Sequence, residues 1–315
     1  MKILVVSGFL GAGKTTFIKE LIRRTKKQPV ILENEYGDNN LDSRSLSGGG
    51  SLEILEFMEG CVCCTKKDSF VNTVLSISAA MDPEYLVIEP TGVGKLGNIL
   101  SSIRRIEYER IALLPSVLVL APRSINSYLK EFPEIYTDQI RNASKIVFSK
   151  SENESPELLQ RVTEQIRTLN ANAEIISSHY TTMSPAWWDA LFEASDSTSD
   201  KSAMPAEAPE YRKSSLKHSL AQTAVQPQQF SLKDVGLSSP STLIILLEDV
   251  LRGRFGYIPR AKGVVRVGGE HLRFDLADGL YAIIAAEEEN PASQCTFIGH
   301  RIDVRSLRSR FSAAQ

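Results

Sequence analysis

The chain has 315 residues, of which 42% are hydrophobic, and its 36 basic and 38 acidic side chains give a formal net charge of -2. This length allows one or two substantial hydrophobic cores, and we expect a large domain followed by a smaller one. The balanced charge gives no reason to expect a nucleic acid or an anionic membrane surface as a partner.

Two apolar runs argue against secretion and membrane insertion. The run that opens the chain ends at Gly8, which is too early for a signal peptide. The longest later run, 111–121, contains Pro115 and falls short of the ~20 residues that a membrane span needs. We therefore expect a soluble, cytoplasmic protein.

The first half of the chain alternates between strand-like and helical patterns. Residues 2–6 are mostly apolar and lead into a glycine-rich turn, after which apolar residues recur at helical spacing from Phe17 to Ile22. Further strand-like runs and helical stretches follow at 30–32, 69–80, 86–88, 117–120, 145–148 and 156–169. Strands that are apolar on both faces and alternate with helices predict an α/β domain with a mostly parallel sheet.

The second half changes character. Residues 195–215 are rich in Ser, Ala, Pro and charged residues, which is typical of a linker. Beyond it we expect strands and helices at 241–251, 263–267, 272–276, 280–284 and 303–311. The predicted organisation is a nucleotide-binding domain over 1–194, a linker over 195–215 and a smaller α+β domain over 216–315.

The turn after the first predicted strand has the sequence of a phosphate-binding loop. Residues 8–15 fit the pattern G-x-x-x-x-G-K-[ST]. In this pattern the backbone N–H groups curl around phosphate oxygens, the lysine reaches the β and γ phosphates, and the hydroxyl binds Mg²⁺. The strand before and the helix after distinguish it from an ordinary glycine turn. The nucleotide-binding candidates are Gly8, Gly11, Ala12, Gly13, Lys14 and Thr15.

A second landmark is the apolar strand 86–88, which ends in Glu89. P-loop proteins place a carboxylate at such a position to hold Mg²⁺ or its water. Surface acids at strand ends are common, so Glu89 is a candidate Mg²⁺ residue only because the phosphate loop precedes it in the chain. We predict Lys14 and Glu89 as the catalytic residues.

Three of the four cysteines stand together as Cys61, Cys63 and Cys64. In an extended segment Cys61 and Cys63 share a face, and a local turn would bring in Cys64. Three thiolates leave a tetrahedral zinc site one ligand short, which suits transfer of a metal to another protein. Thiolates favour Zn²⁺, Cu(I) or iron–sulfur species. The alternative, three inert buried cysteines within four positions, is improbable.

With these motifs in this order, the sequence resembles the CobW family of P-loop GTPases, over nearly the whole chain. The resemblance rests on five segments, which are 8–16, Glu33-Asn34-Glu35-Tyr36-Gly37-Asp38 with Asp42, Gly60-Cys61-Val62-Cys63-Cys64, Glu89-Pro90-Thr91-Gly92, and the C-terminal Arg260-Ala261-Lys262-Gly263 with Phe297-Ile298-Gly299.

The resemblance implies a GTP-hydrolysing metallochaperone that carries zinc, cobalt or iron to a client metalloprotein or cofactor-assembly enzyme, with a homodimer as its candidate assembly. It implies that Glu33 to Asp42 form the switch that responds to the γ phosphate. It also implies a set of site residues. These are Thr16, Asp42 and Gly92 at the nucleotide, Thr15 and Glu89 at Mg²⁺, Cys61, Cys63 and Cys64 at the transition metal, and Glu33 or Asp38 as a further metal ligand.

The sequence departs from the family where guanine is read. The usual N-K-x-D is replaced by Ser149-Lys150-Ser151-Glu152. Glu152 can still accept hydrogen bonds from the guanine ring and Lys150 can still pack on it, whereas the asparagine amide is lost. We expect a preference for GTP that rests mainly on Glu152.

The histidine-rich stretch of many relatives is also missing. His179, His218, His271 and His300 are widely separated, which favours delivery of one ion over metal storage. The sequence assigns no role to these histidines or to Cys295.

Two other functions use the same features. A P-loop ATPase or small-molecule kinase would suit the altered guanine motif but would leave the cysteines without a role. A regulator that binds nucleotide and zinc for structure alone would need a complete tetrahedral metal site. Nucleotide competition distinguishes the GTPase from the ATPase or kinase, and metal release on hydrolysis distinguishes the metallochaperone from the regulator.

Overall fold

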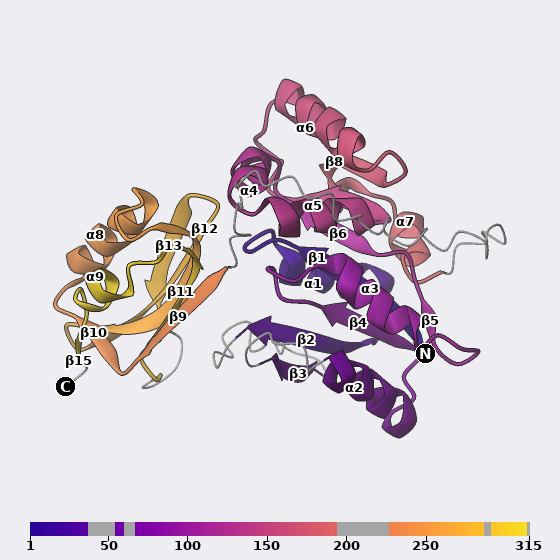
Figure 1. Cartoon of the computed structure of the whole chain (residues 1–315), viewed down its shortest axis with the longest axis horizontal. Helices are drawn as coiled ribbons and strands as arrows, with labels where there is room; N and C mark the ends of the chain where they lie inside the picture. Colours follow the sequence, from indigo (N-terminus) through magenta and orange to yellow (C-terminus); the bar gives the residue numbers. More distant parts are fainter. Residues whose placement is uncertain (37–53, 60–66, 194–226, 287–290, 314–315) are drawn as a thin grey trace, which may run out of the picture.

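The computed structural model describes residues 1–36, 54–59, 67–193, 227–286 and 291–313. These ranges form two units, each built on its own β-sheet (Figure 1). The predicted linker, 195–215, lies outside the described residues, so the proposed domain boundaries stay predictions. Among the described helices, none is both long enough and apolar enough to cross a membrane.

The first sheet has the strand order β3-β2-β4-β1-β6-β7-β8, with β5 also pairing with β1. Every pairing in it is parallel, as predicted. Its strands are β1 (Lys2–Gly8), β2 (Val30–Tyr36), β3 (Ile54–Glu59), β4 (Tyr85–Glu89), β5 (Ala112–Leu113), β6 (Val117–Leu120), β7 (Lys145–Phe148) and β8 (Glu174–His179).

Helices cover both faces of this sheet. Successive side chains of β1 enter different cores, since Ile3 and Val5 pack on one face and Leu4 and Val6 on the other. The cores draw on α1 (Lys14–Thr25) and α7 (Pro185–Ala190) on one face, and on α2 (Lys67–Ala80), α3 (Leu96–Arg104), α4 (Ile125–Glu131), α5 (Pro133–Asn142) and α6 (Pro156–Leu169) on the other. This double cover explains why the strands read as continuous apolar runs.

The second unit is an α+β domain around a mostly antiparallel sheet. Its elements are β9 (Gln228–Lys233), β10 (Val235–Leu237), α8 (Pro240–Leu251), β11 (Tyr257–Val267), β12 (Glu270–Ala277), β13 (Leu280–Ala285), β14 (Gln294–His300), α9 (Val304–Arg308) and β15 (Ser312–Ala313). Its core includes Leu247, Phe274 and Phe297. The α/β P-loop fold with a smaller α+β domain is therefore confirmed.

The last helix is shorter than predicted. The pattern indicated a helix over 303–311, but α9 spans Val304–Arg308. Asp303 is its N-cap and accepts from the Ser306 amide. The helix ends early because the chain must extend into β15, which pairs with β10.

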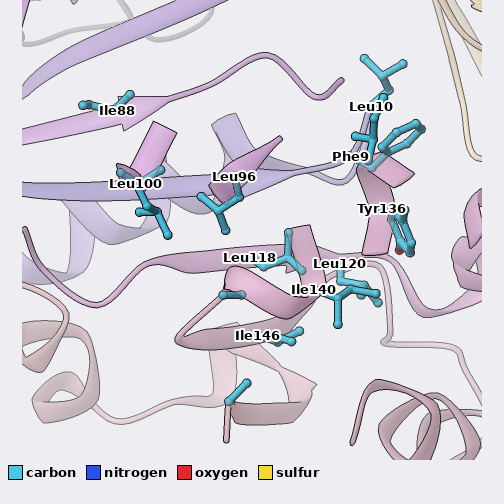
Figure 2. Close-up of a cluster of buried hydrophobic side chains, with 14 of the residues drawn as sticks. Phe9, Leu10, Ile88, Leu96, Leu100, Leu118, Leu120, Tyr136, Ile140 and Ile146 are labelled. Carbon is cyan, nitrogen blue, oxygen red and sulfur yellow. The ribbon is translucent and has the colours of Figure 1, made fainter. Parts of the chain in front are cut away.

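The loop that follows β1 is fixed to the core by Phe9 (Figure 2). This ring is 1% exposed. Its centroid lies 4.4 Å from that of Tyr128, 5.1 Å from Phe132 and 5.6 Å from Tyr136, all on α4 and α5 or between them. The second residue of the phosphate loop thus acts as an aromatic anchor.

Phe9→Ala should lower the free energy of unfolding by about 3–5 kcal/mol, because it removes a fully buried aromatic side chain and leaves a cavity. Tyr108→Ala is the matched control, since Tyr108 is 53% exposed and its loss should change stability little. Urea unfolding followed by circular dichroism measures both, and equal stability of the two variants would contradict the anchoring role.

Candidate nucleotide-binding site

The phosphate loop ends where α1 begins, and its geometry suits an anion. Gly13 is the N-cap of α1 with a left-handed φ of 89°, which glycine adopts without strain. The N-cap provides no side-chain hydrogen bond, and the first turn of α1 contains no acidic residue. The backbone N–H groups and the positive end of the helix dipole are therefore directed at the loop, where a phosphate would lie.

Lys14, Thr15 and Glu89 meet beside this loop. The Thr15 hydroxyl lies 3.0 and 3.2 Å from the two carboxylate oxygens of Glu89. The Lys14 ammonium lies 3.9 Å from the same carboxylate, and both side chains are about nine-tenths buried. A hydroxyl and a carboxylate are the hard oxygen donors that Mg²⁺ prefers, and the neighbouring lysine supplies charge for phosphate, so the residues fit a magnesium–nucleotide complex.

Glu33 extends this acidic edge onto the neighbouring strand. It is paired with Glu89 in the register of β2 and β4, and it is 6% exposed. The other predicted metal ligands, Cys61, Cys63, Cys64 and Asp38, and the predicted nucleotide contact Asp42 lie outside the described residues. Over the ranges that the structure covers, no group of three His, Cys, Asp or Glu residues is arranged to hold a metal.

Gly92 supports the phosphate loop from the side. A Cβ at Gly92 would lie 2.7 Å from the backbone nitrogen of Leu10, so a side chain there would displace the loop. The buried amide of Gln139 donates to the carbonyl oxygens of Gly92 (3.1 Å) and Gly94 (2.9 Å) and fixes this turn. Gly92 thus lies against the loop, while its contact with the nucleotide stays a prediction. Gln139 is a supporting residue that the sequence did not indicate.

Each polar residue of the altered guanine motif at 149, 150 and 152 has a partner in the structure. The Ser149 hydroxyl donates to the carbonyl oxygen of Ala12 at 2.6 Å and ties the motif to the phosphate loop. Ser149 is 2% exposed. Glu152 is more open, and its carboxylate lies 3.1 Å from Nε2 of His179. The ammonium of Lys150 lies 2.5 Å from Asp278 of the second domain.

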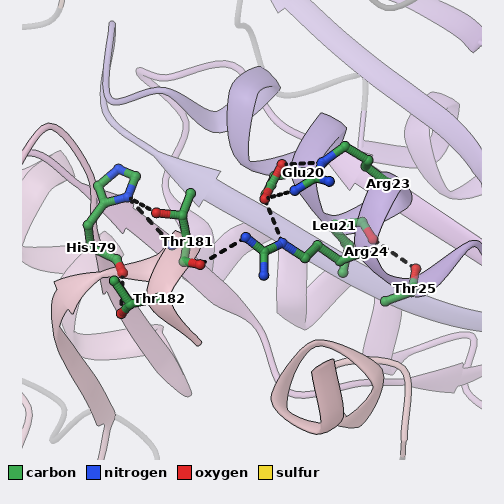
Figure 3. A network of polar contacts seen from close by, with 8 residues as sticks. All are labelled: Glu20, Leu21, Arg23, Arg24, Thr25, His179, Thr181 and Thr182. Carbon is green, nitrogen blue, oxygen red and sulfur yellow. Dashed lines mark hydrogen bonds and ion pairs between the residues drawn. The ribbon is translucent and has the colours of Figure 1, made fainter. Parts of the chain in front are cut away.

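A polar network joins α1 to the end of β8, where His179 lies (Figure 3). Nδ1 of His179 is 2.7 Å from the Thr181 hydroxyl, and Arg24 of α1 donates to the Thr181 carbonyl at 2.8 Å. Arg24 and Arg23 both bind Glu20, and the hydrogen bond from Arg23 is the largest cause that lowers the pKa of Glu20 to about 2. Through Thr181, α1 is thus connected to His179, the residue that contacts Glu152.

Burial explains two further groups near these elements. The pKa of Tyr180 rises to about 12, first because the ring is buried and then because Glu152 is negative, so its hydroxyl stays protonated. Burial raises the pKa of the Cys295 thiol to about 12, and Cys295 is 0% exposed in the core of the second domain. Cys295 is therefore a core residue, and its thiol is no ligand in this fold.

Sequence reasoning missed Asp278 and His179 as parts of this region. The pair Asp278-Gly279 between two strand-like runs is a hairpin signal, although it does not reveal what the turn contacts. His179 is isolated in the sequence, and only the fold brings it to Glu152.

Comparison with known proteins identifies the family. The model of the CobW/HypB/UreG nucleotide-binding domain matches residues 2–177. The chain belongs to this family. The resemblance inferred from the motifs is confirmed, and the matched CobW/HypB/UreG region covers the phosphate loop, Glu89 and the altered guanine motif.

Curated relatives carry names that concern zinc. The chain is 30% identical over 187 residues to the zinc-regulated GTPase metalloprotein activator 1 of Schizosaccharomyces pombe, a match covering 56% of this chain and 46% of the relative. It is 30% identical over 179 residues to the zinc chaperone YeiR of Escherichia coli, covering 56% and 54%. These matches span about half of each relative. The zinc chaperone YjiA of Escherichia coli is 22% identical over 98% of this chain and 97% of its own.

Gly92→Ala should weaken nucleotide binding by about tenfold, because the new methyl group overpacks the loop backbone at Leu10 and this typically costs ~1–3 kcal/mol. Gly94→Ala is the matched control for strain in the same turn, since its Cβ would also meet a close backbone atom, the Thr91 carbonyl oxygen at 3.2 Å, but its nearest neighbours, Thr91 and Ile99, lie outside the phosphate loop. Displacement of a fluorescent GDP analogue measures both affinities. An unchanged affinity for Gly92→Ala would mean that Gly92 does not support the loop.

Proposed function

We propose that this chain is a GTP-hydrolysing metallochaperone that binds zinc and delivers it to a client protein. The observation that carries the proposal is the meeting of Lys14, Thr15 and Glu89 at the start of α1. Family membership and the zinc-related names of the relatives support it.

In the proposed reaction a water oxygen attacks the γ phosphorus of GTP and the bond to the oxygen that bridges to the β phosphate breaks, which gives GDP and phosphate. Lys14 and the N–H groups at the start of α1 stabilise the charge that develops on the phosphate oxygens. Thr15 and Glu89 would hold Mg²⁺, directly or through water, and the ion would supply positive charge to the phosphates.

The base preference is assigned to the motif after β7. Glu152 accepts from the ring N–H and the exocyclic amine of guanine, and the contact with His179 orients its carboxylate. Ser149, at the first position of this motif, connects it to the phosphate loop through its hydrogen bond to the Ala12 carbonyl oxygen. Adenine offers no pair of donors at this edge, so a carboxylate here discriminates against ATP.

The metal is assigned to Cys61, Cys63 and Cys64, with Glu33 or Asp38 as a further ligand. Support comes from the sheet topology and the chain order. Parallel strands end at one edge, and β3 ends at Glu59, two residues before the cysteine motif begins. Glu33 is level with Glu89 in the register of β2 and β4, three residues before Tyr36, which is level with Glu59 in the register of β2 and β3. A switch over Glu33 to Asp42 that responds to the γ phosphate could therefore change the metal site.

Zinc is preferred here over cobalt and iron as cargo because the relatives are named for zinc. A client metalloprotein or cofactor-assembly enzyme, a homodimer and a cytoplasmic location belong to the same proposal.

Lys14→Ala should abolish GTP hydrolysis and weaken nucleotide binding, because it removes the positive charge that faces the β and γ phosphates. Released phosphate measures hydrolysis, and a thermal melt establishes that the variant is folded. The substitution Lys95→Ala is the matched control, since Lys95 is exposed and pairs with Glu134 at the surface. Hydrolysis at the wild-type rate by folded Lys14→Ala would overturn the assignment of the loop.

GTP should displace a labelled guanine nucleotide from the wild-type protein at lower concentration than ATP does, and Glu152→Gln should narrow the difference. Equal displacement by GTP and ATP in wild type would instead favour the ATPase or small-molecule kinase reading.

The wild-type chain should bind one Zn²⁺ or Co²⁺, with a sulfur-to-metal charge-transfer band for cobalt. Replacing Cys61, Cys63 and Cys64 together by Ser should remove the band and leave GTP binding intact, while Cys295→Ser should keep the band. Metal affinity should differ by ~5 to 150-fold between the GTP and GDP states, as expected for allosteric coupling. Equal affinity in both states would leave a nucleotide- and zinc-binding regulator and refute delivery.

A further inference from the structure

The second domain presents a rigid hairpin tip to the nucleotide-binding domain (Figure 1). Strands β12 and β13 are joined by Asp278 and Gly279, and Ala277 pairs with Leu280 across the turn. The φ angles of Asp278 and Gly279 are 54° and 76°. Two positive φ values in a two-residue turn match the type I′ geometry that Asp-Gly favours, so the position of Asp278 is set by the hairpin.

The carboxylate of Asp278 is buried among donors from the first domain. One of its oxygens accepts from the hydroxyls of Ser124 (2.9 Å) and Tyr128 (2.8 Å). The other lies 2.5 Å from the ammonium of Lys150. The Asp278 side chain is 7% exposed. Burial, and next the charge of Asp278, raise the pKa of Tyr128, which therefore remains a hydrogen-bond donor. The buried charge is thus compensated on both oxygens.

The same hairpin lies directly on the phosphate loop. A Cβ built on Gly11 would lie 2.5 Å from the Cβ of Ala277, which is closer than real side chains approach. Gly11 itself has a φ of 73°. The loop that would hold the phosphates and the residue that would cover the base therefore both contact one turn of the second domain.

Lys150 is held at both ends. Its backbone follows β7 with a φ of 52° and is adjacent to Ser149, which is tied to the loop at Ala12. Its ammonium is fixed by Asp278, while the side chain remains 47% exposed. A lysine that covers a base does so with its aliphatic stem. Because Asp278 already fixes the ammonium, the Lys150 side chain has less rotamer freedom to lose when a nucleotide binds, and the entropic cost of binding is smaller.

We propose that Asp278 is a positioning residue of the nucleotide site, which holds Lys150 so that its stem lies along the face of the base. The second domain thereby completes the site. This inference rests on the proposed guanine-nucleotide site. Because coupling is reciprocal, nucleotide binding then strengthens the contact between the two domains by the same factor as that contact strengthens nucleotide binding.

A double-mutant cycle on the full-length chain tests this, with a fluorescent GDP analogue as the probe. Asp278→Asn keeps the acceptor for Ser124 and Tyr128 but removes the charge that holds Lys150. Lys150→Met keeps an apolar stem but removes the ammonium. With Lys150 present, we expect Asp278→Asn to weaken GDP affinity by about tenfold, as for loss of a charge-assisted contact. In the Lys150→Met background we expect the same substitution to weaken GDP affinity by less than twofold.

Two features keep the variants interpretable. His300 with Glu131, whose side-chain atoms are 2.6 Å apart, and the packing of Phe132 against Tyr257 form a second contact between the domains that Asp278→Asn leaves intact. Asp234→Asn is the matched control, since Asp234 is an exposed aspartate with a φ of 53° in another turn of the second domain. It should bind GDP as wild type does.

Each outcome separates the two proposals. If Asp278→Asn binds GDP like wild type, or weakens binding equally in both backgrounds, Asp278 does not act through Lys150 and the inference is overturned while the nucleotide site stands. If the wild-type protein itself fails to bind GDP, the proposed function fails first.

Discussion

The burial of the Phe9 ring fixes the loop on which the nucleotide site depends. The Ala12 N–H donates to the Phe9 carbonyl oxygen within the loop, but N–H groups that are directed at a ligand cannot stabilise the loop, so neighbouring elements must hold it. Phe9 attaches the loop to the aromatic cluster of α4 and α5. The Ser149 hydroxyl donates to the Ala12 carbonyl oxygen, and Gly92 allows the neighbouring turn to approach Leu10. These supports come from separate parts of the chain and keep the loop in shape before any phosphate arrives, which is preorganisation in the physical sense.

Helix α4 lies between the phosphate loop and the second domain and contacts both. The ring of Tyr128 packs 4.4 Å from that of Phe9, measured between centroids, while its hydroxyl donates to Asp278. Phe132, just after α4, likewise packs on Phe9 and on His300. Tyr128 and Phe132 therefore each contact both the loop and the second domain. This is a contiguous packed route between two sites, of the kind through which coupling travels.

Local patterns predicted much of the fold and the phosphate side of the site. The apolar runs of β1, β4, β6 and β7 and the loop motif with Glu89 could be identified because each is complete within a few residues. Strands such as β9 and β14 were missed because they mix polar and apolar residues. In β14 even the polar Thr296 and His300 are buried, so neither an apolar run nor an alternating pattern marks the strand. The contact of Asp278 with Lys150 could not be predicted from the sequence either, because 128 residues separate them and no spacing rule connects a hairpin tip to a strand end.

The burial of Cys295 limits how the chain can complete a metal site. Of the four cysteines in the chain, this one lies in β14 against Gly263, within the core of the second domain, and its raised pKa keeps it a neutral thiol. Thiolate coordination of the proposed metal therefore falls to Cys61, Cys63 and Cys64. An ion that they hold must take its fourth bond from an oxygen or nitrogen of this chain, from water, or from another molecule. A tetrahedron of four thiolates would need its fourth sulfur from another molecule, so under the proposed function the number of sulfur ligands would report when the ion is being passed on.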